Sequence, residues 1–293
     1  MKKKTFTLLF AFIVSYGYSQ KHEHTIDTIV KNYIPLKLYK RSFTEKLTKK
    51  DSLNFKFKDN DTLVLVDNFI PKGVYVPYEF KDSIFLNHYK KIAFNHKKNK
   101  FSYDTKMKYW KDDIKIFFSK SISKNDKKQL MRLASELSSK VDSLNIYQVR
   151  KLEDSNFTIY NKGDYEYETR MGNYSKSYYY IHWNGKSQIY KGNIRLVNEN
   201  QFSDDESIMK LKRLFIQALG HFKLNNDLEC ENYFANCDTN KKFLTELDLE
   251  ILKYHYSYGI CKGTDLATFV EQHIIAKEAL KEHNHRINFA HVE

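Results

Sequence analysis

Three histidines are the side chains of this chain best suited to bind a metal or move a proton: His182, His221 and His255. Imidazole is a common zinc ligand and titrates near neutral pH. Each histidine nevertheless stands in a segment that predicts another role. His182 lies in an aromatic strand, His221 follows a glycine expected to end a helix, and His255 sits within an apolar and aromatic helix. We therefore expect no shared metal site from them, and a solvated tail for the histidines of 283–291.

Other arrangements typical of catalysis are absent from the sequence. There is no G-x-S-x-G turn, no Walker loop and no glycine-rich dinucleotide-binding turn. The acidic run Asp204–Glu206 is explained by the favourable field at the start of a helix. Asn225–Asp227 is expected to form a turn whose side chains bond to local amides.

Three cysteines, Cys230, Cys237 and Cys261, permit one disulfide in an exported protein. Cys230 and Cys237 enclose a short loop between two expected helices, so we predict that they form a disulfide and that Cys261 stays a free thiol. The C-x-x-C spacing of structural zinc sites is absent, and we expect no metal there.

Hydrophobic periodicity predicts the elements that must position these residues. Strands are expected at 62–66, 73–77, 113–118, 156–160 and 193–197. Three capping boxes, Ser123–Asp126, Ser203–Glu206 and Thr245–Asp248, are expected to start amphipathic helices. The first runs to about 144, the second covers 206–220 with Gly220 as its left-handed stop, and the third runs to 256. A last helix is expected over 264–283.

The second helix and the segment that follows it contain a recognisable pattern. Its matching residues are Gln217, Ala218, Leu219, Gly220, Asn226, Asp227, Leu244, Thr245, Leu247 and Asp248. Tyr109-Trp110 stands where the pattern would open. Over about 160 residues the chain resembles a secreted bacterial family of unknown function whose domain is similar to zincin metallopeptidases. The resemblance implies a mixed sheet with an active-site helix, although the family's acidic pair is replaced here by Arg213 and Leu214.

The parent zincin motif is HExxH, in which two histidines one turn apart bind zinc and the glutamate activates the bound water. Laid on this helix, those positions become Arg213, Leu214 and Gln217, with Gly220 retained and Lys223 at the place of a third ligand. Cationic side chains repel a metal ion. The resemblance thus implies a degenerate motif with no catalytic residues and no metal.

Eight of the 22 tyrosines fall within residues 160–190. Such a belt fits an edge hairpin with aromatic cross-strand pairs, and it also offers stacking surfaces to a peptide or a sugar. In zincins the strand beside the cleft receives an extended peptide. Candidate cleft-binding residues are therefore Tyr179, Trp183, Gln217, Asn226 and Asp227.

Residues 1–20 have the pattern of a secretory signal peptide, with three lysines before a short apolar run. Its removal would lower the formal charge from +13 to +10. The lysines are scattered, so we expect no specific nucleic-acid partner. No later apolar run is long enough to span a membrane, and we expect export to the periplasm or the extracellular space.

The sequence thus predicts an α+β protein: a zincin-like mixed sheet with a long amphipathic helix and a degenerate active-site helix, preceded by a small β-rich segment. The expected divisions are 1–20, 21–100, 101–262 and 263–293, namely signal peptide, β-rich segment, zincin-like domain, and last helix with its His-rich tail. We expect an exported, inactive module that binds a peptide, protein or glycan and needs no cofactor. The alternative is a secreted peptidase-like hydrolase whose site is drawn from His182, His221 and Asp227.

Overall fold

The computed structural model of the chain describes residues 32–42, 47–58, 61–66, 74–94, 106–197, 204–239, 241–284 and 286–291. The expected signal peptide, Ser203 of the second capping box and His285 of the tail lie outside these residues. The chain divides into two compact units, Met1–Pro71 and Lys72–Glu293.

The first unit holds a three-stranded antiparallel sheet of order β1-β3-β2 with two short helices. Its elements are β1 (Asn32–Pro35), α1 (Leu36–Ser42), α2 (Lys49–Ser52), β2 (Lys56–Lys58) and β3 (Asp61–Val66). Ile34, Val64 and Val66 form its small core. The predicted strand at 62–66 is confirmed by β3.

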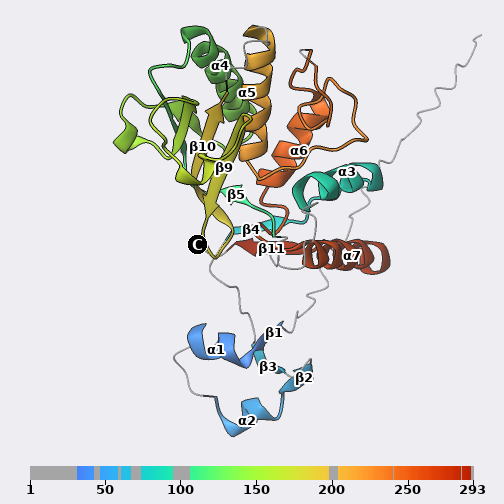
Figure 1. The fold of residues 1–293 in the computed structure, drawn as a ribbon. Helices are drawn as coiled ribbons and strands as arrows, with labels where there is room; N and C mark the ends of the chain where they lie inside the picture. The colour runs from blue at the N-terminus through green and yellow to red at the C-terminus, as the bar shows by residue number, and fades with distance from the viewer. Residues whose placement is uncertain are drawn as a thin grey trace, which may run out of the picture. The chain divides into compact units, whose positions relative to one another are not determined.

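The second unit is built on a mostly parallel sheet of order β5-β10-β8-β6-β7, with β9 antiparallel to β10 (Figure 1). Its strands are β5 (Tyr109–Trp110), β6 (Ile114–Phe118), β7 (Ile146–Gln148), β8 (Phe157–Asn161), β9 (Tyr178–Trp183) and β10 (Gln188–Leu196). Gly192 of β10 lies where a Cβ would come within 2.5 Å of the Phe157 ring, so that position requires glycine. Within the described residues β9 pairs with β10 alone, which leaves its other side as an edge of the sheet.

Helices cover one face of this sheet. α4 (Lys124–Lys140) and α5 (Asp204–Ala218) pack side by side (Figure 1). α6 (Glu246–Tyr256) also packs against α4. The predicted N-caps Ser123 and Thr245 start α4 and α6, because their hydroxyls accept hydrogen bonds from the amides of Asp126 and Asp248. The reciprocal bond of a full capping box forms at Thr245, whereas the Asp126 carboxylate accepts from the Ser123 hydroxyl instead of the Ser123 amide. Alternate side chains of β6, such as Ile114 and Ile116, are fully buried beneath the helices.

The opposite face of the sheet is polar and is covered by the segment 162–177. The buried guanidinium of Arg195 on β10 donates to Glu166 at 2.9 Å and to the carbonyls of Gly172 and Tyr174. The Tyr160 hydroxyl donates to the same Glu166 carboxylate, and the pair fixes this segment over the sheet.

A helix, α3 (Ser83–Phe94), lies where irregular connections were expected, so the prediction of a β-rich segment to residue 100 is wrong there. Asp82 caps this helix, because its carboxylate accepts hydrogen bonds from two amides of the first turn at 2.8 Å. Tyr89 on α3 stacks edge-on against Tyr254 of α6 at 4.8 Å between ring centroids. Because α3 shares the core of the second unit, the units divide at residue 71 rather than near residue 100.

The C-terminal residues also belong to the second unit rather than to a separate tail. α7 (Leu266–His283) buries Phe269 against Phe94 of α3 at 5.2 Å. β11 (Asn288–His291) pairs antiparallel with β4 (Val74–Pro77). The structure is therefore an α+β fold with a mostly parallel sheet and small antiparallel sheets.

Candidate functional site

The helix that carries the motif positions, α5, turns its apolar side to the core. Leu211 and Phe215 are fully buried, and the Phe215 ring meets Phe157 of β8 edge-on at 5.4 Å. Arg213 and Gln217, one turn apart, are only partly buried and share another face. Leu214, which the resemblance aligns with the motif's glutamate, is buried.

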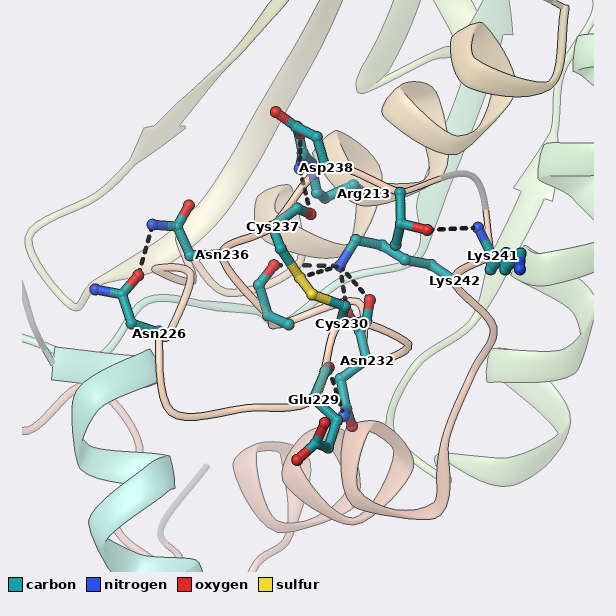
Figure 2. Close-up of a disulfide and its surroundings, with 12 residues drawn as sticks. Arg213, Asn226, Glu229, Cys230, Asn232, Asn236, Cys237, Asp238, Lys241 and Lys242 are labelled. Atoms are coloured by element: carbon teal, nitrogen blue, oxygen red, sulfur yellow. Dashed lines mark hydrogen bonds and ion pairs between the residues drawn. A yellow bond between two sulfur atoms is a disulfide. The ribbon is translucent and has the colours of Figure 1, made fainter.

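Arg213 is bound to the loop that follows the helix (Figure 2). Its Nη1 donates to Oδ1 of Asp238 at 2.6 Å and to the carbonyl of Cys237 at 3.3 Å. Cys237 is joined to Cys230 by a disulfide, with 5.7 Å between their Cα atoms. The positive charge of Arg213 is therefore paired, and this side chain anchors the loop to α5.

A buried lysine fills the inside of the disulfide loop (Figure 2). Nζ of Lys242 donates to the carbonyls of Cys230, Asn232 and Ala235 at 2.9, 2.7 and 3.2 Å. Burial lowers the pKa of Lys242, but three carbonyl acceptors satisfy its three ammonium protons. Nothing in the sequence pattern signals this role, because a lysine among many lysines looks like a solvated residue.

Asp248 anchors the same loop from α6. Its carboxylate accepts hydrogen bonds from the amides of Tyr233 and Phe234 at 3.0 and 3.3 Å, in addition to its bonds in the capping box. Burial raises the pKa of Asp248, although these hydrogen bonds oppose that effect. The sequence pattern predicts the cap but not the loop contacts, whose partners lie about 15 residues apart in the chain.

The end of α5 differs from the prediction. His221, with φ of 55°, takes the left-handed position that was assigned to Gly220. The amide of Phe222 donates to the carbonyl of Gln217 at 2.9 Å, a bond typical of this helix ending. Gly220 is needed for space instead, because a Cβ there would lie 2.3 Å from the Phe222 ring. The side chain of Gln217 donates to the Phe222 carbonyl at 3.4 Å.

The remaining motif positions make contacts with α3 and with the disulfide loop. The amide of Lys223 donates to the carbonyl of Ile92 at 2.9 Å. Asn226 is exposed and accepts a hydrogen bond from Asn236 at 2.7 Å (Figure 2). Asp227 forms an ion pair with Lys91 of α3, and that hydrogen bond lowers the pKa of Asp227.

The end of α5 meets the edge strand β9. Tyr179 is buried, and its hydroxyl lies 3.1 Å from Nδ1 of His221. Trp183 is 37% exposed, with its ring 5.7 Å from the His221 ring and the Lys108 ammonium 4.9 Å from its centroid. Two predicted cleft residues are therefore brought together with His221, whereas Asn226 and Asp227 bind elsewhere.

The other two candidate histidines have separate partners. His182 lies on the polar face of the sheet, where its Nε2 is 2.6 Å from the Glu168 carboxylate. His255 is fully buried, with its Nε2 donating to the Lys108 carbonyl at 2.8 Å and its Nδ1 3.1 Å from the Tyr89 hydroxyl. Burial lowers the pKa of His255 to about 3, so the ring is neutral at physiological pH. Within the described residues no group of three His, Cys, Asp or Glu side chains could hold a metal ion.

The chain matches no protein-family model and no curated protein. In the part of the chain that is described, every helix is too short or too polar to cross a membrane.

Proposed function

We propose that this protein is an exported, zincin-like binding module in which the metal-binding helix has become part of the scaffold, and that it binds an extended peptide along β9. The proposal rests on three motif positions of α5: the first ligand position anchors a loop, the position of the catalytic base is buried, and the second ligand position donates to a backbone carbonyl. The observation that carries it is the hydrogen bond of Arg213 to the disulfide loop.

Strand addition is the binding mode that the sheet favours. β9 is antiparallel and lies at the edge next to α5, as the resemblance implies for a strand that borders a cleft. An exposed strand edge offers amide and carbonyl groups to an extended peptide, and alternate side chains supply specificity. Tyr178 and Trp183, each 37% exposed, stand at the two ends of this strand.

Export is part of the proposal because residues 1–20 have the pattern of a signal peptide. The disulfide is compatible with an oxidising compartment. A protein, a glycan or a peptide would each meet the same aromatic edge, but only a peptide or protein strand can pair with the backbone of β9.

The test uses the chain without residues 1–20 and a library of fluorescent, unstructured nonapeptides, with binding followed by anisotropy. We expect selected peptides to bind and Trp183→Ala to weaken them about tenfold, as for an aromatic residue central to an interface. Tyr147→Ala is the matched control, because Tyr147 is equally exposed on β7 at the opposite edge. No binding at all, or equal losses in both variants, would contradict the proposal.

The alternative, a secreted hydrolase, requires His182, His221 and Asp227 to meet beside Gln217. In the structure they contact Glu168, Tyr179 and Lys91 respectively. A fluorogenic peptide library incubated with the same protein tests this alternative, and cleavage that is abolished by His182→Gln or His221→Gln would favour it.

A further inference from the structure

The guanidinium of Arg170 is held on the polar face of β9 by two side chains of that strand. Arg170 is exposed and lies in a short 3-10 helix, η2 (Thr169–Met171), which packs against β9. Its Nη1 donates to the Tyr180 hydroxyl at 2.9 Å and lies 3.4 Å from Nδ1 of His182. The guanidinium carbon is 5.3 Å from the Tyr180 ring centroid, within the range of a cation–π contact. An exposed arginine is thus fixed to the edge strand through one of its terminal nitrogens.

His182 is itself held by a buried carboxylate. Its Nε2 lies 2.6 Å from the carboxylate of Glu168, and that carboxylate also accepts a hydrogen bond from the Arg170 amide at 3.2 Å. When Nε2 of the neutral ring donates to Glu168, Nδ1 is an acceptor and takes a proton from Nη1 of Arg170. Glu168 is therefore hydrogen-bonded to the histidine and to the backbone of η2 rather than to the guanidinium, and it fixes the place from which Arg170 extends.

Most of the hydrogen-bonding capacity of this guanidinium is left over. Arginine has five N–H donors in a planar fork, and within the described residues only Nη1 of Arg170 has a partner. Each carboxylate of the segment 162–177 is bound elsewhere: Asp164 to Ser119, Glu166 to Arg195 and Glu168 to His182. In the described part of the chain no carboxylate lies within ion-pair distance of Arg170, so Nη2 and Nε remain for a bound group.

Positive charge flanks both faces of β9 at the end that carries Trp183. Lys191 on β10 is paired in register with His182, so its side chain lies on the same polar face as Arg170. On the other face, the ammonium of Lys108 lies 4.9 Å from the Trp183 ring centroid. The whole chain also has a formal charge of +13. A strand that pairs with this edge therefore meets a potential that favours negative charge.

We propose that β9 selects acidic peptides, and that Arg170 binds the carboxylate of a glutamate or aspartate on the added strand. This inference rests on the peptide binding proposed above and names its substrate class. Successive side chains of an added strand point to opposite faces of the sheet, so a peptide residue opposite Tyr180 or His182 lies on the face that carries Arg170. The planar fork of arginine matches a carboxylate with two parallel N–H···O bonds. Tyr180 and His182 are positioning residues for that fork.

The test uses the chain lacking residues 1–20 and two pools of fluorescent, unstructured nonapeptides with blocked ends. The pools carry no charged residue except at the central position, which is glutamate in one pool and glutamine in the other. Binding is followed by anisotropy at low salt. We expect the glutamate pool to bind about fivefold more tightly, the upper end of the range for an exposed ion pair. The preference should fall below about twofold in 1 M salt, which screens exposed charges beyond about 3 Å.

Three variants assign the preference to the anchored guanidinium. Arg170→Gln should make the two pools bind equally and leave the affinity for the glutamine pool unchanged, because the strand edge is intact. Arg150→Gln is the matched control: Arg150 is also exposed and follows β7 at the opposite edge of the sheet, so its loss removes the same charge and should leave the preference unchanged. Tyr180→Phe keeps the ring but not the hydroxyl, and it should lower the preference to about twofold because the fork is less pre-organised.

The outcomes separate this inference from the function on which it rests. If the parent binds both pools equally and Trp183→Ala weakens both, the acidic preference is overturned and peptide binding at β9 stands. If neither pool binds, both are overturned. A preference that survives Arg170→Gln, or that is lost equally in Arg170→Gln and Arg150→Gln, would overturn the role of Arg170, because the preference would then come from another residue or from the net charge of the protein.

Discussion

Arg213 on α5 donates a hydrogen bond to the carbonyl of Cys237, so that the helix and the disulfide loop are directly joined. The Arg213 guanidinium also donates to the Asp238 carboxylate in the same loop. The same loop is held from inside by Lys242 and from α6 by Asp248. The helix at the centre of the candidate site thus anchors the connection between α5 and α6.

His255 should make stability depend on pH below neutrality. Its pKa of about 3 in the folded protein lies below the ordinary 6.5, so between these values the unfolded chain binds a proton that the folded chain does not. Stability is therefore highest above pH 6.5 and falls as pH drops, by about 1.4 kcal/mol per pH unit, or about 2 kcal/mol from pH 6.5 to 5. Urea unfolding at a series of pH values measures this slope.

The matched pair for that measurement is His255→Gln and Tyr256→Phe. His255→Gln should remove this contribution to the slope. Tyr256→Phe should lower the free energy of unfolding without changing the slope. The Tyr256 hydroxyl, whose pKa is raised by burial, does not titrate in this range. An unchanged slope in His255→Gln would contradict the assignment.

Gly220→Ala should destabilise the protein although glycine is not in a left-handed conformation there. The added Cβ would meet the ring of Phe222, which is itself packed against His255 at 4.6 Å. We expect a loss of about 1–3 kcal/mol in the free energy of unfolding, as for overpacked cores. His221→Gly is the comparison, because glycine adopts the left-handed backbone conformation of this position without steric strain. An alanine variant as stable as the parent would disprove the close approach.

Phe215 and Gln217 lie on different faces of α5: Phe215 is buried in the core and Gln217 is partly exposed. Phe215→Ala should cost about 3–5 kcal/mol through the cavity it leaves beside Phe157. Gln217→Ala should cost about 1 kcal/mol, the value of one hydrogen bond to a carbonyl. Calorimetry of both variants checks the difference, and equal costs would mean that the face assignment is wrong.

The disulfide between Cys230 and Cys237 should be found by peptide mapping of protein recovered from an oxidising compartment. Replacing both residues by serine should lower the free energy of unfolding by about 2–3 kcal/mol, because the unfolded chain regains the conformational entropy that closing this short loop removes. Cys261→Ser, at the partly buried free thiol, is the control. Free thiols at both positions, or a bond from either to Cys261, would reject this pairing.

Local patterns were enough to predict much of the fold. A capping box such as Thr245–Asp248 and the alternation of Ile114, Ile116 and Phe118 depend on neighbours in sequence, and both are confirmed. The sequence also contains the signals of α3, because Phe85 and Tyr89 recur at helical spacing and Asp82 supplies an N-cap. The surrounding lysines weaken its hydrophobic pattern, so the helix was not predicted.

Contacts between distant segments could not be predicted in the same way. The partners of Lys242 and Asp248 depend on how the loop folds back onto α6, and no spacing rule encodes that path. The left-handed residue is His221 rather than the predicted Gly220. Position 220 requires glycine because the Phe222 ring packs against it, and not because its backbone is left-handed.

The zinc content of the purified chain lacking residues 1–20, compared with that of the variant Arg213→His/Gln217→His/Lys223→His, tests the zincin-like reading of α5 most directly. Leu214 is left in place because a glutamate there would be buried. The variant Arg213→Ala/Gln217→Ala/Lys223→Ala is the control for the loss of the loop anchor. We predict that the parent and the alanine variant retain no stoichiometric zinc after dialysis against a weak chelator, while the folded histidine variant binds about one zinc per chain. Tightly held zinc in the parent, or a folded histidine variant that binds no more than the alanine control, would contradict that reading.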